Sequence, residues 1–127
     1  MTRILSLDDN SSLLAAMRCI LEAEGYESLT TTNNKEAWGL LQTQSVDLFT
    51  QDIFRSDVDG LEFYRRMRSD KTLRDIPVIL ITASHLKPNF VENLGVAGYI
   101  AKPFDLQELL TIIASSLLKR DKRLLQK

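Results

Sequence analysis

The stretch Pro77-Val78-Ile79-Leu80-Ile81-Thr82 holds the strongest β-branched run of this 127-residue sequence. Its consecutive apolar residues leave no polar face, which is typical of a strand that is buried on both sides in a parallel sheet. A sheet of this kind needs helices on both of its faces. The stretch therefore favours an α/β fold.

Short apolar runs alternate with longer segments of helical period on both sides of that stretch. This alternation is the pattern of repeated strand–helix units around a parallel sheet. We therefore expect further strands at 4–7, 27–31, 46–51 and 98–101. The first expected helix has an apolar stripe over 13–21 and ends at Gly25. The other four helices are expected at 33–44, at 61–68, within 85–94 and at 106–117. The predicted fold is a doubly wound, five-stranded parallel sheet with five helices, the flavodoxin-like arrangement.

Two of the expected helices have clear start signals. Asn33 with Glu36, and Asp105 with Glu108, have the spacing of capping boxes. The fourth helix is expected to be weak, because Pro88 lies near its start.

Composition restricts the class of protein. With 44% hydrophobic and 26% charged residues the chain is an ordinary globular sequence, expected to form one domain over 1–127 with a core at about 3–118. Its formal charge of −1 gives no overall basic field for direct binding to nucleic acid. The basic tail at 119–127 is interpreted as a helix end or the start of a linker.

The only cysteine, Cys19, cannot form an intramolecular disulfide and is expected to pack beside the first helix's apolar stripe. A reducing, cytoplasmic location is the expectation. No apolar run approaches the roughly 20 residues that would span a bilayer, so membrane insertion is not expected.

Polar residues that leave the predicted strands carry the chemistry, because functional groups gather at the carboxyl ends of parallel strands. The first strand delivers Asp8 and Asp9, and the later strands deliver Asp52, Thr82 and Lys102. Carboxylates held this close repel one another unless a cation lies between them. Mg²⁺ suits such oxygen ligands, with Asp9 and Asp52 expected as direct ligands and Asp8 as one that acts through a bound water. If Asp52 attacks a phosphoryl donor, Lys102 and the Thr82 hydroxyl can satisfy the other phosphoryl oxygens.

At these positions the sequence closely resembles the receiver domains of two-component response regulators, including the stand-alone chemotaxis receiver. The order and spacing of the matching segments follow the family from about Arg3 to Leu118. The segments are Leu7-Asp8-Asp9-Asn10, Gln51-Asp52, Asp59-Gly60, Thr82-Ala83, and Tyr99 with Lys102-Pro103-Phe104.

The resemblance implies a role for each matching residue. Asp52 would be the phospho-acceptor, Asp8 and Asp9 the magnesium pair, the backbone carbonyl of Phe54 a further metal ligand, and Lys102 the group that binds the phosphoryl. The chain would then be a switch that phosphorylates and dephosphorylates itself, with no separate substrate.

The resemblance also implies a switch and its partners. Thr82 would move toward the phosphoryl group and Tyr99 would turn inward, which alters the surface of the fourth helix, fifth strand and fifth helix. A sensor histidine kinase or a phosphotransfer protein would supply the phosphoryl group. A downstream protein or a second copy of the chain would bind the altered surface.

The loop after the phosphorylated strand departs from the family pattern, because Arg55-Ser56 replaces the usual Met-Pro. Loss of proline removes a backbone restraint, and the arginine either faces solvent, which we favour, or reaches a phosphate. Phe54 has no polar group and Ser84 has no carboxylate to place a hydrolytic water, which predicts a long-lived phosphoaspartate unless Phe54 packs against a neighbouring loop. His85 is interpreted as a surface residue.

Three rival functions were weighed. A haloacid dehalogenase-like phosphohydrolase would need two acids separated by one residue, and Asp8-Asp9 lacks that spacing. A flavodoxin-like electron carrier would need a phosphate-binding loop where this chain is acidic. A receiver-like scaffold that never accepts phosphate is the third, and the intact set of site residues disfavours it.

Overall fold

The structure is a computed structural model that describes residues 1–55, 58–83 and 86–126. Within 54–59 it describes no side chains. The predictions for Ser56, Ser84 and His85, and those for the side chains of Phe54 and Arg55, therefore fall outside the described residues.

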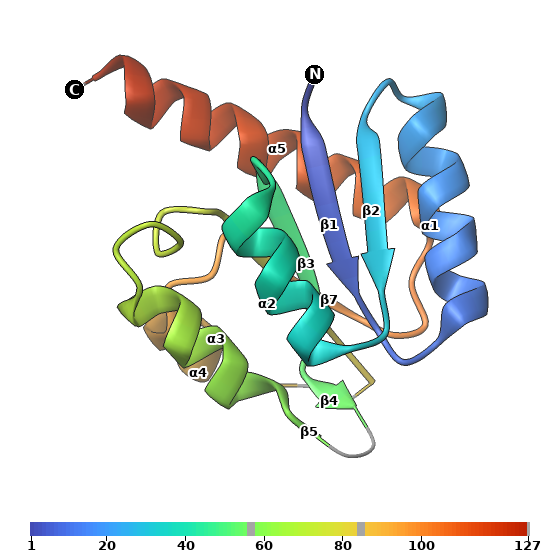
Figure 1. The fold of residues 1–127 in the computed structure, drawn as a ribbon, viewed down its shortest axis with the longest axis horizontal. Helices are drawn as coiled ribbons and strands as arrows, with labels where there is room; N and C mark the ends of the chain where they lie inside the picture. Colours follow the sequence, from blue (N-terminus) through green and yellow to red (C-terminus); the bar gives the residue numbers. More distant parts are fainter. Residues whose placement is uncertain (56–57, 84–85, 127) are drawn as a thin grey trace.

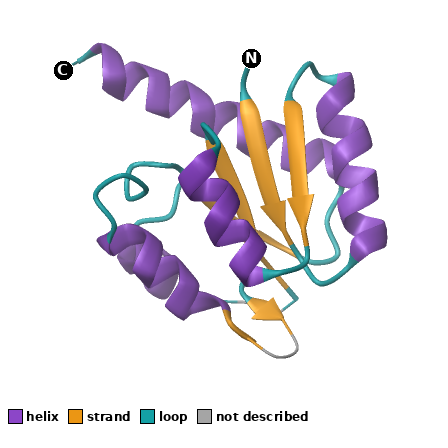
Figure 2. Ribbon diagram, in the orientation of Figure 1, coloured by secondary structure: helices purple, strands orange, loops and turns teal. Residues whose placement is uncertain are grey.

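A five-stranded parallel sheet forms the centre of the protein (Figures 1 and 2). Its strand order is β2-β1-β3-β6-β7, so the buried run that follows Pro77 lies next to the central strand. This confirms the predicted doubly wound fold. The strands are β1 (Arg3–Leu7), β2 (Glu27–Thr31), β3 (Leu48–Asp52), β6 (Val78–Thr82) and β7 (Gly98–Ala101).

Helices cover both faces of the sheet, and each face has its own apolar cluster (Figure 1). Leu5, Phe49 and Leu80 point to the face that α2, α3 and α4 cover. Their neighbours Ile79 and Ile81 point to the face that α1 and α5 cover. Alternation along strands that are buried throughout explains why no polar face was visible in the sequence. The helices are α1 (Ser11–Ala23), α2 (Asn34–Thr43), α3 (Gly60–Ser69), α4 (Pro88–Leu94) and α5 (Leu106–Leu125).

Side-chain caps fix the starts of three helices. Asn10 accepts a hydrogen bond from the Leu13 amide at 3.0 Å and caps α1. Asn33 and Asp105 cap α2 and α5 in the same way, as predicted. No side-chain hydrogen bond caps α4, and none of its residues is buried. The fourth helix is therefore as weakly held by its own sequence as expected.

Two expectations need correction, for the loop after β3 and for Cys19. The loop after β3 contains a short antiparallel hairpin, β4 (Phe54–Arg55) with β5 (Val58–Asp59), where no strand was predicted. Strands this short carry no periodic signal. Helix α5 continues to Leu125, which agrees with the interpretation of the basic tail as a helix end. Cys19 is exposed rather than packed beside the stripe of α1.

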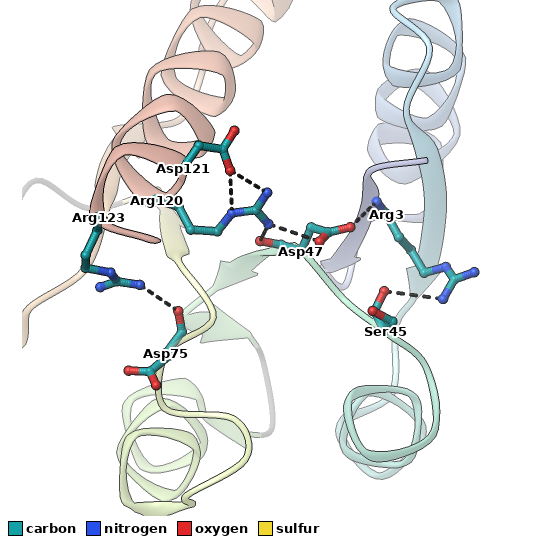
Figure 3. A network of polar contacts seen from close by, with 7 residues as sticks. All are labelled: Arg3, Ser45, Asp47, Asp75, Arg120, Asp121 and Arg123. Carbon is teal, nitrogen blue, oxygen red and sulfur yellow. Dashed lines mark hydrogen bonds and ion pairs between the residues drawn. The ribbon is translucent and has the colours of Figure 1, made fainter. Parts of the chain in front are cut away.

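Contacts between residues far apart in the sequence hold the last turns of α5 (Figure 3). Arg120 pairs with the Asp47 carboxylate at 3.0 Å and also donates to the Asp47 carbonyl at 3.3 Å. The other Asp47 carboxylate oxygen accepts a hydrogen bond from the Arg3 amide at 2.8 Å. One aspartate before β3 therefore ties the start of β1 to the last turns of α5. The apolar period of α5 alone could not predict this.

Gly60 begins α3 where the chain passes very close to another backbone segment. A Cβ at this position would lie 2.5 Å from the Ile53 Cα and 2.7 Å from the Ile53 carbonyl oxygen. The Gly60 carbonyl also accepts a hydrogen bond from the buried Gln51 amide group at 2.7 Å. Glycine is therefore required here by close approach of backbone, next to the strand that carries Asp52.

We expect Gly60→Ala to lower the free energy of unfolding by about 2 kcal/mol or more, because neither backbone can move without disturbing the other. Gly39→Ala is the matched control, since nothing lies within 4 Å of its Cβ position and it sits inside α2. The control should gain about 0.5–1 kcal/mol from helix propensity. Urea unfolding of both variants measures the difference, and equal midpoints would refute the close-approach argument.

Candidate functional site

The carboxyl ends of four strands meet at one edge of the sheet. Leu7 is in register with Gln51, Asp52 with Ile81, and Thr82 with Ala101. The residues at or just after these strand ends therefore lie side by side, as expected for parallel strands. They are Asp8, Asp52, Thr82 and Lys102.

The Lys102 ammonium lies between two buried carboxylates. Its Nζ is 2.8 Å from Asp8 Oδ2 and 2.9 Å from Asp52 Oδ2. The two aspartate side chains are only 3% and 8% exposed, while that of Lys102 is 22% exposed. Two carboxylates withdrawn from water in this way need a counter-charge, and Lys102 supplies one.

The same contacts shift the acidity of the lysine. Burial by itself would lower the pKa of Lys102, but hydrogen bonds and Coulombic attraction from Asp8 and Asp52 outweigh it, and the pKa is raised above 10.5. The lysine is therefore fully charged at neutral pH.

Backbone hydrogen bonds hold this arrangement in place. The Asp8 amide donates to the Thr31 carbonyl at 3.2 Å, and Asp8 Oδ1 accepts from the Asn10 amide at 2.9 Å. The Lys102 amide donates to the Thr82 carbonyl at 2.7 Å. Each charged side chain thus begins from backbone that is fixed by a neighbouring strand or loop.

Asp9 is placed differently from the other acids. It is exposed, whereas Asp8 is buried beside Lys102. Across the described ranges, no group of three or more carboxylate, histidine or cysteine side chains is arranged to hold a metal ion. The donor chemistry still suits Mg²⁺, because two buried carboxylates meet here beside a third one residue along the chain. The predicted metal role of the Phe54 carbonyl rests on backbone in β4, whose contacts with this edge are not described.

Of the two predicted switch residues, Thr82 lies at the end of β6 beside the charged cluster, and Tyr99 lies further back in β7, in register with Leu80. Thr82 is completely buried. Tyr99 is half-buried in β7, and its hydroxyl accepts a hydrogen bond from the Leu86 amide at 3.0 Å, just before α4.

A second tyrosine, on the expected helix at 61–68, holds the other end of α4. The Tyr64 hydroxyl donates to the Leu94 carbonyl at 2.6 Å. Burial raises the pKa of Tyr64, although the nearby Arg68 charge opposes the shift. A hydroxyl at an otherwise apolar helix position was the available signal, since a buried tyrosine needs a partner.

Known proteins that resemble this chain belong to a family with this fold. The family model for the response regulator receiver domain matches residues 4–114. The chain belongs to this family. Receiver domains are the phosphorelay switches of two-component signalling and are in general not classical enzymes.

Relatives and solved structures agree. The chain is 34% identical to the polar-differentiation response regulator DivK of Brucella anthropi over 90% of its own length and 94% of DivK. It is 31% identical to the nisin biosynthesis regulatory protein NisR of Lactococcus lactis, of which it spans 52%. A CheY-like receiver from Methanospirillum hungatei has a TM-score of 0.86 at 28% identity, with coverage of 97% and 98% of the two chains.

A further relative was solved with ligands. The response regulator TrrA of Thermotoga maritima, in complex with Mg²⁺ and BeF, matches with a TM-score of 0.79 and 29% identity over 91% of this chain and 99% of TrrA.

In the described part of the present chain, no helix has the length and apolar character needed to span a membrane.

We expect Lys102→Met to lower the free energy of unfolding at pH 7 by about 3 kcal/mol, because it leaves two buried carboxylates without their counter-charge. Lys71→Met, at an exposed lysine, should stay within about 0.5 kcal/mol of wild type. Because the pKa of Lys102 is raised in the folded protein, its contribution to stability is complete below the pKa of the unfolded state. That contribution is lost as the pH rises through the pKa of the folded state. Denaturant unfolding should therefore show that the free energies of unfolding of wild type and Lys102→Met differ by a constant amount between about pH 7 and 9, and that this difference shrinks at more alkaline pH. A difference as small as that of the control would contradict this role.

Proposed function

We propose that Asp52 accepts a phosphoryl group from a sensor histidine kinase or a phosphotransfer protein, in a Mg²⁺-dependent reaction that switches the α4–β7–α5 surface. The observation that carries this proposal is the Lys102 ammonium, which contacts both Asp8 and Asp52 at the edge of the sheet. A buried carboxylate beside a fixed cation is suited to become a negatively charged phosphoryl site.

Asp52 is the nucleophile in this scheme. One of its carboxylate oxygens attacks phosphorus, the bond between phosphorus and the donor's leaving group breaks, and the leaving group departs with the bonding electrons. Lys102 already lies 2.9 Å from Asp52 Oδ2, so its ammonium can follow the charge onto the phosphoryl oxygens without a large movement. The Thr82 hydroxyl, at the end of the adjacent strand β6, can donate to a further oxygen.

Asp9 and Asp52 are the residues we propose as direct Mg²⁺ ligands, with Asp8 acting through a bound water and the Phe54 carbonyl as a further ligand. The cation would neutralise charge on the transferred group. Asp8 and Asp52 share Lys102 as their counter-charge, so a bound cation would release the lysine toward the phosphoryl group. The complex of TrrA with Mg²⁺ and BeF supports magnesium binding in this family.

Thr82 and Tyr99 are the proposed switch. Tyr99 holds the segment before α4 through the Leu86 amide, and α4 has no buried residue of its own. Movement of Thr82 toward a phosphoryl group would open space beside Tyr99, and an inward turn of that ring would release the hydrogen bond. A downstream protein or a second copy would then bind the changed surface, because a switch requires differential affinity. The exposed, unbridged Cys19 fits the reducing cytoplasm as the place where this occurs.

Incubation with acetyl phosphate and Mg²⁺ tests the acceptor. Intact mass should show one added phosphoryl group on wild type and none on Asp52→Asn, because the amide is not a competent nucleophile. Asp121→Asn, at an exposed aspartate on α5, is the matched control and should be modified like wild type. Asp9→Ala should bind Mg²⁺ much more weakly. Unmodified wild type with both acetyl phosphate and a cognate kinase would refute the proposal.

The switch is tested with beryllium fluoride and Mg²⁺, which mimic the phosphoryl group. The amide resonances of Leu86, Tyr99 and α4 should shift in wild type. In Tyr99→Phe the unliganded protein should already exchange its Leu86 amide hydrogen faster, because the acceptor hydroxyl is gone. Tyr26→Phe, at another half-buried tyrosine, should leave that exchange unchanged. Shifts confined to the strand ends, with α4 and α5 unaffected, would favour the passive scaffold instead.

A further inference from the structure

A cavity of about 230 Å³ opens at the amino-terminal edge of the sheet, at the opposite end of β6 from Thr82. The end of α3, the segment that enters β6, the connection from α4 to β7, and α5 surround it. Both apolar and cationic residues line it. The apolar and small residues are Ile76, Pro77, Val78, Gly95, Ala97 and Ser116.

Four cationic side chains and one acid line this cavity, and in the described part of the chain three of the cations have no acidic partner. Within residues 1–55, 58–83 and 86–126, neither Arg68, Lys119 nor Arg123 forms an ion pair with a carboxylate. Arg120 differs, since Asp47 and Asp121 neutralise it at 3.0 and 2.9 Å. The cavity therefore carries an excess of positive charge in a chain whose formal charge is −1.

The guanidinium groups of Arg68 and Arg123 are oriented by backbone carbonyls rather than by acidic side chains. Arg68 Nη1 donates to the Arg74 carbonyl at 2.8 Å, and Arg123 Nη2 donates to the Asp75 carbonyl at 3.3 Å. Figure 3 shows the Arg123 guanidinium pointing to that carbonyl while the Asp75 carboxylate points away from it. Each guanidinium is thus steered toward the same loop and keeps further N–H donors unused by a carboxylate.

We propose that this cavity binds the phosphate groups of a small phosphorylated molecule. Two guanidinium groups and an ammonium around one recess match a dianion, because arginine presents paired donors with the geometry of phosphate oxygens. The apolar wall that contains Ile76 and Pro77 can contact the organic part of the same molecule. The cavity lies at the opposite edge of the sheet from Asp52, so this site is separate from the proposed phosphorylation site.

Titration with inorganic pyrophosphate, without Mg²⁺ and at constant ionic strength, tests the proposal by amide NMR. The amides of Ile76, Gly95, Ala97 and Lys119 should shift together along one saturable curve. Arg68→Gln/Arg123→Gln should weaken that binding by about tenfold or more, since it removes two of the three unpaired charges. The double variant keeps Arg120 and its contacts to Asp47, so the fold of α5 is preserved.

The control removes the same charge elsewhere on the same helices. Arg65→Gln/Lys122→Gln alters exposed residues of α3 and α5 that do not line the cavity, and it should bind pyrophosphate like wild type. Equal weakening in both double variants, or shifts that never saturate, would mean only general attraction of anions to a basic surface and would overturn the proposal.

A final arm identifies the source of the phosphate. The same proteins are sedimented with phosphatidylcholine vesicles that contain or lack phosphatidic acid. Saturable pyrophosphate binding without sedimentation assigns the cavity to a free phosphorylated compound. Sedimentation that needs phosphatidic acid and is lost in Arg68→Gln/Arg123→Gln assigns the phosphate to a lipid headgroup, and overturns the assignment to a free molecule.

Discussion

The contact of Lys102 with Asp8 and Asp52 neutralises the two buried carboxylates at the edge of the sheet. Two carboxylates this deeply buried are tolerable only with a cation beside them, and that cation must come from a strand end at the same edge. Lys102 meets this need because β7 pairs with β6, so that its amide can bind the Thr82 carbonyl. The parallel order of the strands is thus what allows the acidic edge to exist in a stable protein.

Helix α4 lies between that edge and the surface. It is held in place mainly by side chains of other elements. It has no side-chain cap and no buried residue, so two tyrosine hydroxyls define its ends. Tyr99 binds the backbone before it and Tyr64 binds its last carbonyl. An element with so little packing of its own can shift at small energetic cost when one tether is lost. In the proposed switch, the rigid core and the weakly held helix are therefore complementary parts.

The sequence predicted what repeats locally and failed where distant contacts decide. Buried strands, the caps at Asn33 and Asp105, and the meeting of strand ends follow from short-range patterns. The hairpin of β4 and β5 is too short to give a period, and Arg55-Ser56 suggested only an altered loop. The apolar period of α5 gave no sign that Arg120 meets Asp47, a partner 73 residues away. Lys102 was expected at this edge as the group that binds the phosphoryl, whereas its direct contact with both Asp8 and Asp52 was not predicted.

The two edges of the sheet carry opposite charge, and the segments that flank α4 contact Tyr99 of β7 on one side and the basic cavity on the other. Before its first residue, Leu86 binds Tyr99 beside the acidic edge. Past its last residue, Gly95 lines the basic cavity, with the Arg68 guanidinium 3.4 Å from the position of a Cβ there. Any displacement of α4 must therefore change the shape of the cavity as well as the signalling surface. By thermodynamic reciprocity, an anion bound at one edge would bias phosphorylation at the other as strongly as phosphorylation biases anion binding.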